Sequence, residues 1–82
     1  MKNVMLLTGA GQIGMAIARR MGAGMKIFVG DKKLENAQAA AETMNQAGFD
    51  ATAVETDLSS RESIRKLIAQ GQKQGEIKML IN

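Results

Sequence analysis

Apolar and polar positions follow two different periods along this chain, and the changes of period separate candidate strands from candidate helices. Val4–Leu7 is continuously apolar, which is typical of a strand covered on both faces of a parallel sheet. Lys26–Val29 and Lys78–Ile81 are similarly short and apolar, and both are predicted to be strands. Ala51–Thr56 is less apolar, so we expect this strand at an edge of the sheet.

Between the predicted strands, apolar side chains recur every three or four residues, which predicts three helices. The first two cover Gln12–Met21 and Lys33–Gln46. The third follows Ser59, which fits a capping box with Glu62: the serine would cap the helix and the glutamate would reach back to it. Glycines are expected to end these helices, namely Gly22 and Gly24, Gly48, and Gly71 or Gly75.

The resulting order, β-α-β-α-β-α-β, predicts an α/β fold with a doubly wound parallel sheet, Rossmann-like, in strand order 3-2-1-4. The first two helices would lie on one face of the sheet and the third on the other. A binding cleft is expected at the carboxyl ends of strands one and four, where the strand order reverses. Met79, Leu80 and Ile81 would form an open apolar edge. We therefore expect residues 1–82 to be the N-terminal half of a larger domain, which self-associates or pairs with a missing C-terminal part.

A glycine-rich turn joins the first predicted strand to the first predicted helix. Its spacing is G-x-G-x-x-G, formed by Gly9, Gly11 and Gly14. Gly9 permits the tight turn, Gly11 leaves room for a pyrophosphate, and Gly14 allows close packing of helix on strand. Gln12 and Ile13 lie in the opening turn of the helix, whose free N–H groups and positive dipole end attract an anion. This context predicts a dinucleotide-binding loop.

Asp31 follows the second predicted strand, where a carboxylate accepts hydrogen bonds from both hydroxyls of an adenosine ribose. It also repels a 2′-phosphate, which favours NAD over NADP. Two lysines follow, Lys32 and Lys33, and these either attract a 2′-phosphate or face solvent in the first turn of the helix. The alternative for Asp31 is a solvated acid or the N-cap of the second helix.

Taken together, these motifs resemble the short-chain dehydrogenase/reductase family. The resemblance rests on four segments: Thr8-Gly9-Ala10 with Gly14, Asp31, Asp57-Leu58, and Leu80-Ile81-Asn82 as the start of the family's Asn-(Asn/Ala)-Ala-Gly segment. The glycine loop is one residue shorter than the family's usual T-G-x-x-x-G-x-G. The resemblance covers essentially the whole chain but only the N-terminal third of a typical member.

The resemblance implies an oxidoreductase that binds NAD, with NADP less favoured. It also implies that Asp57 accepts a hydrogen bond from the adenine amino group while the Leu58 N–H serves the ring. The alternative for Asp57 is an acid near the Ser59 cap. The family's catalytic Ser and Tyr-x-x-x-Lys lie further downstream, and this chain contains no Tyr. We therefore expect no catalytic residue here and no turnover by this chain alone.

Composition removes several classes of function. The chain has 82 residues, a net charge of +3, and no Cys, His, Trp or Tyr. Without Cys there is no disulfide or thiolate metal site, and without His the commonest metal ligand and general base is missing, so no metal is expected. An aromatic platform for nucleic acid is not expected, because the only aromatic residues are two Phe. No apolar run approaches the ~20 residues of a membrane span, so a cytoplasmic location is expected.

Two other functions fit part of the pattern. A methyltransferase fragment that binds S-adenosylmethionine would also use a glycine-rich loop and acids after strands two and three, but it usually carries an acid just before the loop, where this chain has Leu7 and Thr8. A non-enzymatic truncated product would persist by pairing its open edge. A phosphate-binding P-loop is excluded, because no Gly-Lys-Ser/Thr follows the glycines.

Overall fold

The computed structural model describes residues 2–8, 12–21 and 23–81. They form seven elements in alternating order: β1 (Lys2–Thr8), α1 (Gln12–Met21), β2 (Lys26–Asp31), α2 (Leu34–Gln46), β3 (Asp50–Glu55), α3 (Arg61–Gln74) and β4 (Gly75–Ile81). The four strands form one parallel sheet in the order β3-β2-β1-β4. The predicted fold class and strand order are therefore confirmed. Among the described helices, none is long and apolar enough to cross a membrane.

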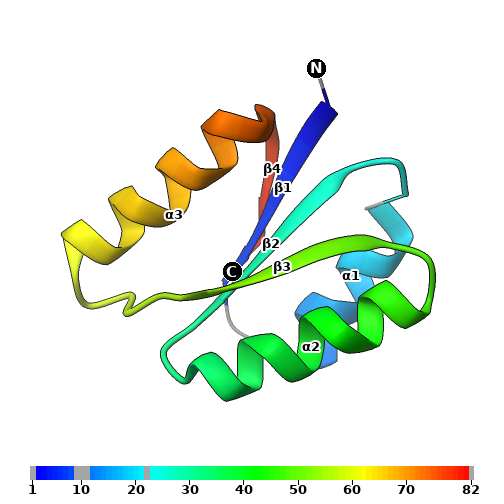
Figure 1. Ribbon diagram of the computed structural model, residues 1–82, viewed down its shortest axis with the longest axis horizontal. Coiled ribbons are helices and arrows are strands. Elements are labelled where there is room, and N and C mark those ends of the chain that lie inside the picture. The colour runs from blue at the N-terminus through cyan, green and yellow to red at the C-terminus, as the bar shows by residue number, and fades with distance from the viewer. Residues whose placement is uncertain (1, 9–11, 22, 82) are drawn as a thin grey trace.

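Two apolar clusters lie on opposite faces of the sheet, because successive side chains of a strand point to opposite sides. Met5 and Leu7 of β1 belong to a cluster that α2 covers with Ala37, Ala41 and Met44. On the other face, α3 places Leu67 against a cluster that includes Val4, Leu6 and Phe28. Figure 1 shows α1 and α2 on one side of the sheet and α3 on the other, as predicted.

The start of α3 differs from the sequence prediction. The N-cap is Ser60, whose hydroxyl oxygen accepts a hydrogen bond from the Ser63 N–H at 3.2 Å. The predicted capping box of Ser59 and Glu62 is therefore wrong by one residue. The physical reason lies in the preceding turn, where the N–H and hydroxyl of Ser59 both donate to the carboxylate of Asp57. Ser59 thus belongs to the loop and Ser60 to the helix.

The fourth strand is longer than predicted, and its edge is less open. It begins at Gly75, directly after α3, instead of at Lys78. Ile81 is buried and Met79 is partly buried, since both pack with the cluster on the α2 face. Leu80 is 60% exposed, and it lies beside Leu6 on the face that α3 only partly covers. Of the three residues expected at an open edge, Leu80 alone is strongly exposed.

The opposite edge of the sheet is β3, as its lower apolar content predicted. Here the side chain of Asn45, near the end of α2, makes two hydrogen bonds to one residue of β3. Its amide NH2 donates to the Ala51 carbonyl at 2.9 Å, and its Oδ1 accepts from the Ala51 N–H at 2.7 Å. The tight turn between Asn45 and Ala51 contains Gly48 at φ +95°, a backbone conformation that favours glycine.

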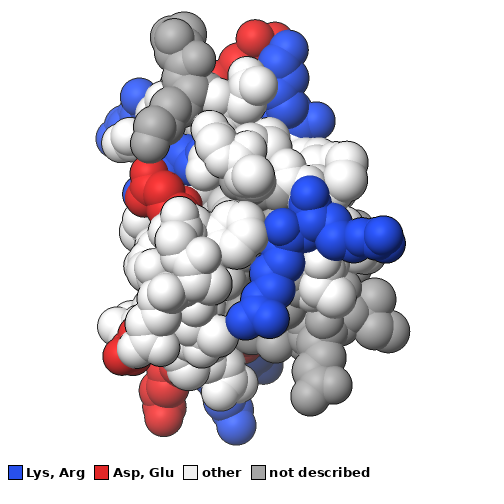
Figure 2. Space-filling view, turned by 90° about the vertical axis from the view of Figure 1, so that its right-hand side faces the viewer, with Lys and Arg blue, Asp and Glu red and all other residues white. Residues whose placement is uncertain are grey.

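The charged surface is dispersed. On the face shown in Figure 2, Lys and Arg side chains occur at the top, the centre and the bottom, with uncharged surface between them. This distribution follows the sequence, in which the basic residues are spread along the chain. One described ion pair joins neighbouring strands, where the Lys26 ammonium lies 2.9 Å from the Asp50 carboxylate and ties β2 to β3.

Candidate functional site

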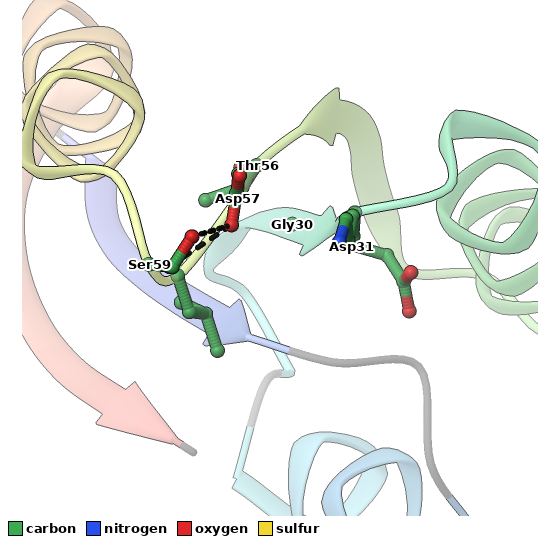
Figure 3. Close-up of a pocket in the computed structure, with 7 residues that line it drawn as sticks. Gly30, Asp31, Thr56, Asp57 and Ser59 are labelled. Atoms are coloured by element: carbon green, nitrogen blue, oxygen red, sulfur yellow. Dashed lines mark hydrogen bonds between the residues drawn. The ribbon is translucent and has the colours of Figure 1, made fainter.

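A cavity of about 310 Å³ opens at the carboxyl ends of β2 and β3 (Figure 3). It is lined by residues from the two loops that follow these strands: Gly30, Asp31, Lys32, Thr56, Asp57, Leu58 and Ser59. Parallel strands bring their carboxyl ends to the same edge of a sheet, which is where open α/β folds bind ligands. The structure therefore brings together four of the predicted site residues that are far apart in the sequence.

The wall of this cavity depends on a glycine at the end of β2. A Cβ built on Gly30 would lie 2.7 Å from the Thr56 Oγ1 and 3.0 Å from the Thr56 Cβ. Thr56 cannot easily yield, because it is 1% exposed and its N–H donates to the Asp31 carbonyl at 2.8 Å. Gly30 thus allows the buried Thr56 to pack against β2. Sequence reasoning singled out neither residue; the available signal was a glycine directly before Asp31 in an apolar strand.

Asp31 holds the turn from β2 into α2. One carboxylate oxygen, Oδ1, accepts a hydrogen bond from the Lys33 N–H at 2.9 Å, which forms an Asx turn. The N-cap of α2 is Lys33, and its side chain makes no capping hydrogen bond. Asp31 is therefore fixed just before the helix, at the end of β2 (Figure 3). The side chains of Lys32 and Lys33 are exposed.

Asp57 is held by a similar turn after β3. Its Oδ1 accepts two hydrogen bonds from Ser59, one from the N–H at 2.9 Å and one from the hydroxyl at 2.7 Å. These hydrogen bonds favour the charged form and hold the pKa of Asp57 below its ordinary value, with a smaller contribution from the positive charge of Lys32. Leu58 is 54% exposed and adds apolar surface to the rim of the cavity.

The glycine-rich loop is only partly described. Gly9 and Gly11 lie outside the described residues, as does Asn82. Gln12, Ile13 and Gly14 form the first turn of α1, so the helix begins directly after the loop, as predicted. Next to the loop, the hydroxyl of Thr8 donates to the Ile81 carbonyl at 3.1 Å and joins the carboxyl ends of β1 and β4. The cleft expected between these two strands borders the residues that are not described.

Comparison with known proteins supplies the family. The family model for short chain dehydrogenases matches residues 3–82. The chain belongs to this family. A short-chain dehydrogenase/reductase of Alternaria brassicicola, bsc3, is 33% identical over 76 residues, which is 93% of this chain and 28% of that protein. An uncharacterized oxidoreductase of Bacillus subtilis, YxjF, is 36% identical over 84 residues, covering 99% of this chain and 33% of its own length.

Two solved structures of oxidoreductases have the same fold. A hydroxysteroid dehydrogenase from Escherichia coli superposes with a TM-score of 0.86 at 26% identity, over 98% of this chain and 34% of its own. An actinorhodin polyketide ketoreductase solved with NADPH gives a TM-score of 0.86 at 32% identity, over 96% of this chain and 31% of its own. The chain thus spans about a third of the length of these relatives. Family membership favours the dehydrogenase prediction over the methyltransferase alternative.

Proposed function

We propose that this chain binds the adenosine half of a nicotinamide dinucleotide in the cavity at the ends of β2 and β3. The observation that carries the proposal is the pair of carboxylates, Asp31 and Asp57, at one cavity at the carboxyl ends of β2 and β3, in a chain of the short-chain dehydrogenase family. Carboxylates accept hydrogen bonds from ribose hydroxyls and from an adenine amino group, so the donor set of this nucleotide fits the acceptors present. When bound, the dinucleotide supplies the hydride chemistry, and this chain binds and orients it.

Asp31 is proposed to bind the adenosine ribose and to favour NAD over NADP. The Lys33 N–H holds one carboxylate oxygen, so the acid is fixed at the end of β2 rather than free to swing away. A fixed negative charge at this point repels the additional 2′-phosphate of NADP. Lys32 lines the same cavity, and its positive charge partly offsets this repulsion.

Asp57 and Leu58 are proposed to hold the adenine ring. The carboxylate of Asp57 is kept in its charged, accepting form by Ser59, which suits a hydrogen bond from the adenine amino group. The Leu58 N–H would serve a ring nitrogen, and its exposed side chain offers apolar surface to the ring face. The pyrophosphate is proposed to lie on the glycine-rich loop, formed by Gly9, Gly11, Gln12, Ile13 and Gly14.

The 82 residues are proposed to be the N-terminal half of a Rossmann domain that gains its stability by pairing at β4, with another copy or with further chain. The exposure of Leu80 and the share of the relatives that the chain covers support this proposal. The activity of a whole dehydrogenase is proposed only for a chain that spans the full length of the relatives. The cytoplasmic location expected from the sequence stays a prediction.

The binding test is a titration of the full chain with NADH and NADPH, followed by nucleotide fluorescence. We expect NADH to bind more tightly, NAD to displace it, and S-adenosylmethionine to leave it bound. Asp31→Ala should weaken NADH binding by about 1–3 kcal/mol, because a charged acceptor is lost, and should favour NADPH relative to NADH. Glu42→Ala is the matched control, since Glu42 is an exposed acid on α2 that does not line the cavity. An unchanged ratio of NADH to NADPH affinity in Asp31→Ala would refute the assignment.

A further inference from the structure

Ser59 holds the carboxylate of Asp57 through two hydrogen-bond donors. The N–H and the hydroxyl of Ser59 both donate to the same oxygen, Oδ1, at 2.9 Å and 2.7 Å. Figure 3 shows both hydrogen bonds reaching Asp57 from the same side. Two hydrogen bonds to one oxygen restrict the rotation of the carboxylate more than a single hydrogen bond would. Among the described residues, none makes a hydrogen bond to the other oxygen, Oδ2.

The serines around this turn have separate tasks. Ser63 accepts a hydrogen bond from the Asp57 N–H at 2.9 Å, and the Ser60 N–H donates to the Asp57 carbonyl at 2.9 Å. Ser60 also caps α3 through the Ser63 N–H. These contacts anchor the main chain of Asp57 on the first turn of α3. Of the three serines, Ser59 is the one that contacts the carboxylate, so the structure separates the placement of the backbone from the orientation of the acid.

We propose that Ser59 is a positioning residue, which orients the Asp57 carboxylate so that Oδ2 accepts a hydrogen bond from the amino group of an adenine ring in the cavity. This inference rests on the proposed function. An exocyclic amino group donates hydrogen bonds and needs an acceptor. Because Oδ1 of Asp57 already accepts from Ser59, Oδ2 is the acceptor that the carboxylate offers in a defined position. The Asp57 side chain is already ordered in the free protein, so the binding free energy is not reduced by the entropy lost on ordering it.

The first experiment needs no nucleotide. The pKa of the Asp57 carboxyl is measured by NMR titration of the full chain and of single variants at Ser59 and Ser60. Ser59→Ala removes the hydroxyl donor and should raise the pKa of Asp57, whereas Ser59→Thr keeps both donors and should leave it near the wild-type value. Ser60→Ala is the matched control, because it removes the cap of α3 without touching the carboxylate. Lys32 and Asp31 line the same cavity and are unchanged in every variant.

The second experiment compares NADH with its purine analogue, in which a hydrogen atom replaces the amino group and the ring nitrogens stay acceptors. The wild-type chain should prefer NADH. Ser59→Ala should weaken NADH binding by about three- to tenfold, the effect of one lost hydrogen bond, and leave the analogue nearly unchanged. A purely structural effect of the substitution would weaken both ligands equally. Ser59→Thr should restore the preference.

The outcomes separate the two proposals. If the wild-type chain binds NADH, and Ser59→Ala changes neither the pKa of Asp57 nor the preference for adenine, the positioning role is refuted while the proposed function stands. If the wild-type chain binds neither dinucleotide, the proposed function fails, and the role of Ser59 toward adenine fails with it. A raised pKa together with a selective loss of NADH affinity supports both.

Discussion

Replacing Gly30 with alanine tests how closely β2 and β3 pack beneath the cavity. The added Cβ would lie 2.7 Å from the Thr56 Oγ1, 3.0 Å from the Thr56 Cβ and 3.2 Å from the Leu67 Cδ2. Ordinary van der Waals contact begins near 3.4 Å, so the closest atom would have to move by several tenths of an ångström. Thr56 resists this movement because its hydroxyl donates to the Val54 carbonyl and its N–H donates to the Asp31 carbonyl.

Overpacking of a tight core typically costs ~1–3 kcal/mol, and we expect Gly30→Ala to lower the free energy of unfolding by about 2 kcal/mol. Gly71→Ala is the matched control. Its Cβ would meet the Leu6 Cδ2 at 3.0 Å, the end of a flexible side chain, and the Val4 Cγ1 at 3.3 Å, so no contact is as close as the one between Gly30 and the Thr56 Oγ1. Gly71 lies inside α3, where alanine gains ~1 kcal/mol of helix propensity. The two terms oppose each other, so the control should be nearly neutral.

The assay is urea unfolding followed by far-UV circular dichroism, since the chain has no Trp or Tyr to serve as a fluorescent probe. A double-mutant cycle adds the decisive measurement. Thr56→Ala removes the closest atom, so Gly30→Ala should cost about 1 kcal/mol less in that background than in the wild type. Equal stability of Gly30→Ala and Gly71→Ala, or strict additivity in the cycle, would refute the close packing described here.

Three further predictions concern charge, turnover and association. Ser59 lowers the pKa of Asp57, so the stability that this contact contributes is present above the unfolded value near pH 4 and is lost as the pH falls through the lower folded value. The urea midpoint of the wild type should therefore drop more steeply in acid than that of Asp57→Asn, and parallel profiles would contradict the assignment. The isolated chain should not oxidise NADH, because it contains neither Tyr nor His; purified activity that is lost on mutation of Gly11 would overturn this. At micromolar concentration the chain should self-associate in sedimentation experiments. Leu80→Lys should reduce this association, because Leu80 is the exposed apolar residue of β4. A wild-type chain that sediments as a sharp monomer and melts cooperatively would contradict this prediction.

The periodicity of the sequence was sufficient to predict the order of the elements, because buried strands and amphipathic helices differ over several residues. The three helices were placed within two residues of their observed N-termini. Single side chains were harder to assign. Ser59 and Ser60 are adjacent serines with the same capping propensity, and the choice between them depends on the carboxylate of Asp57, which competes for one of them.

The sequence predicted the charged residues of the candidate site, but it did not reveal the role of its small residues. Asp31 and Asp57 follow apolar runs, so their place at the ends of strands was readable from the sequence. The role of Gly30 was not, because it depends on how near Thr56 comes from another strand. Likewise, the burial of Ile81 beside the exposed Leu80 follows from which face of the sheet each side chain meets, a property of the packed layers.

The two hydrogen bonds between Asn45 and Ala51 make the borders of the sheet unequal. In a parallel strand the N–H and C=O of one residue point to the same side, and those of Ala51 point away from β2. The side-chain amide of Asn45 therefore makes the two hydrogen bonds that a peptide group of a further strand would make. It occupies the backbone of Ala51, where another strand would begin to pair with β3. No comparable pair of hydrogen bonds is seen along the described part of β4. The contact at Ala51 thus disfavours extension of the sheet at the start of β3, and it leaves β4 as the more open border.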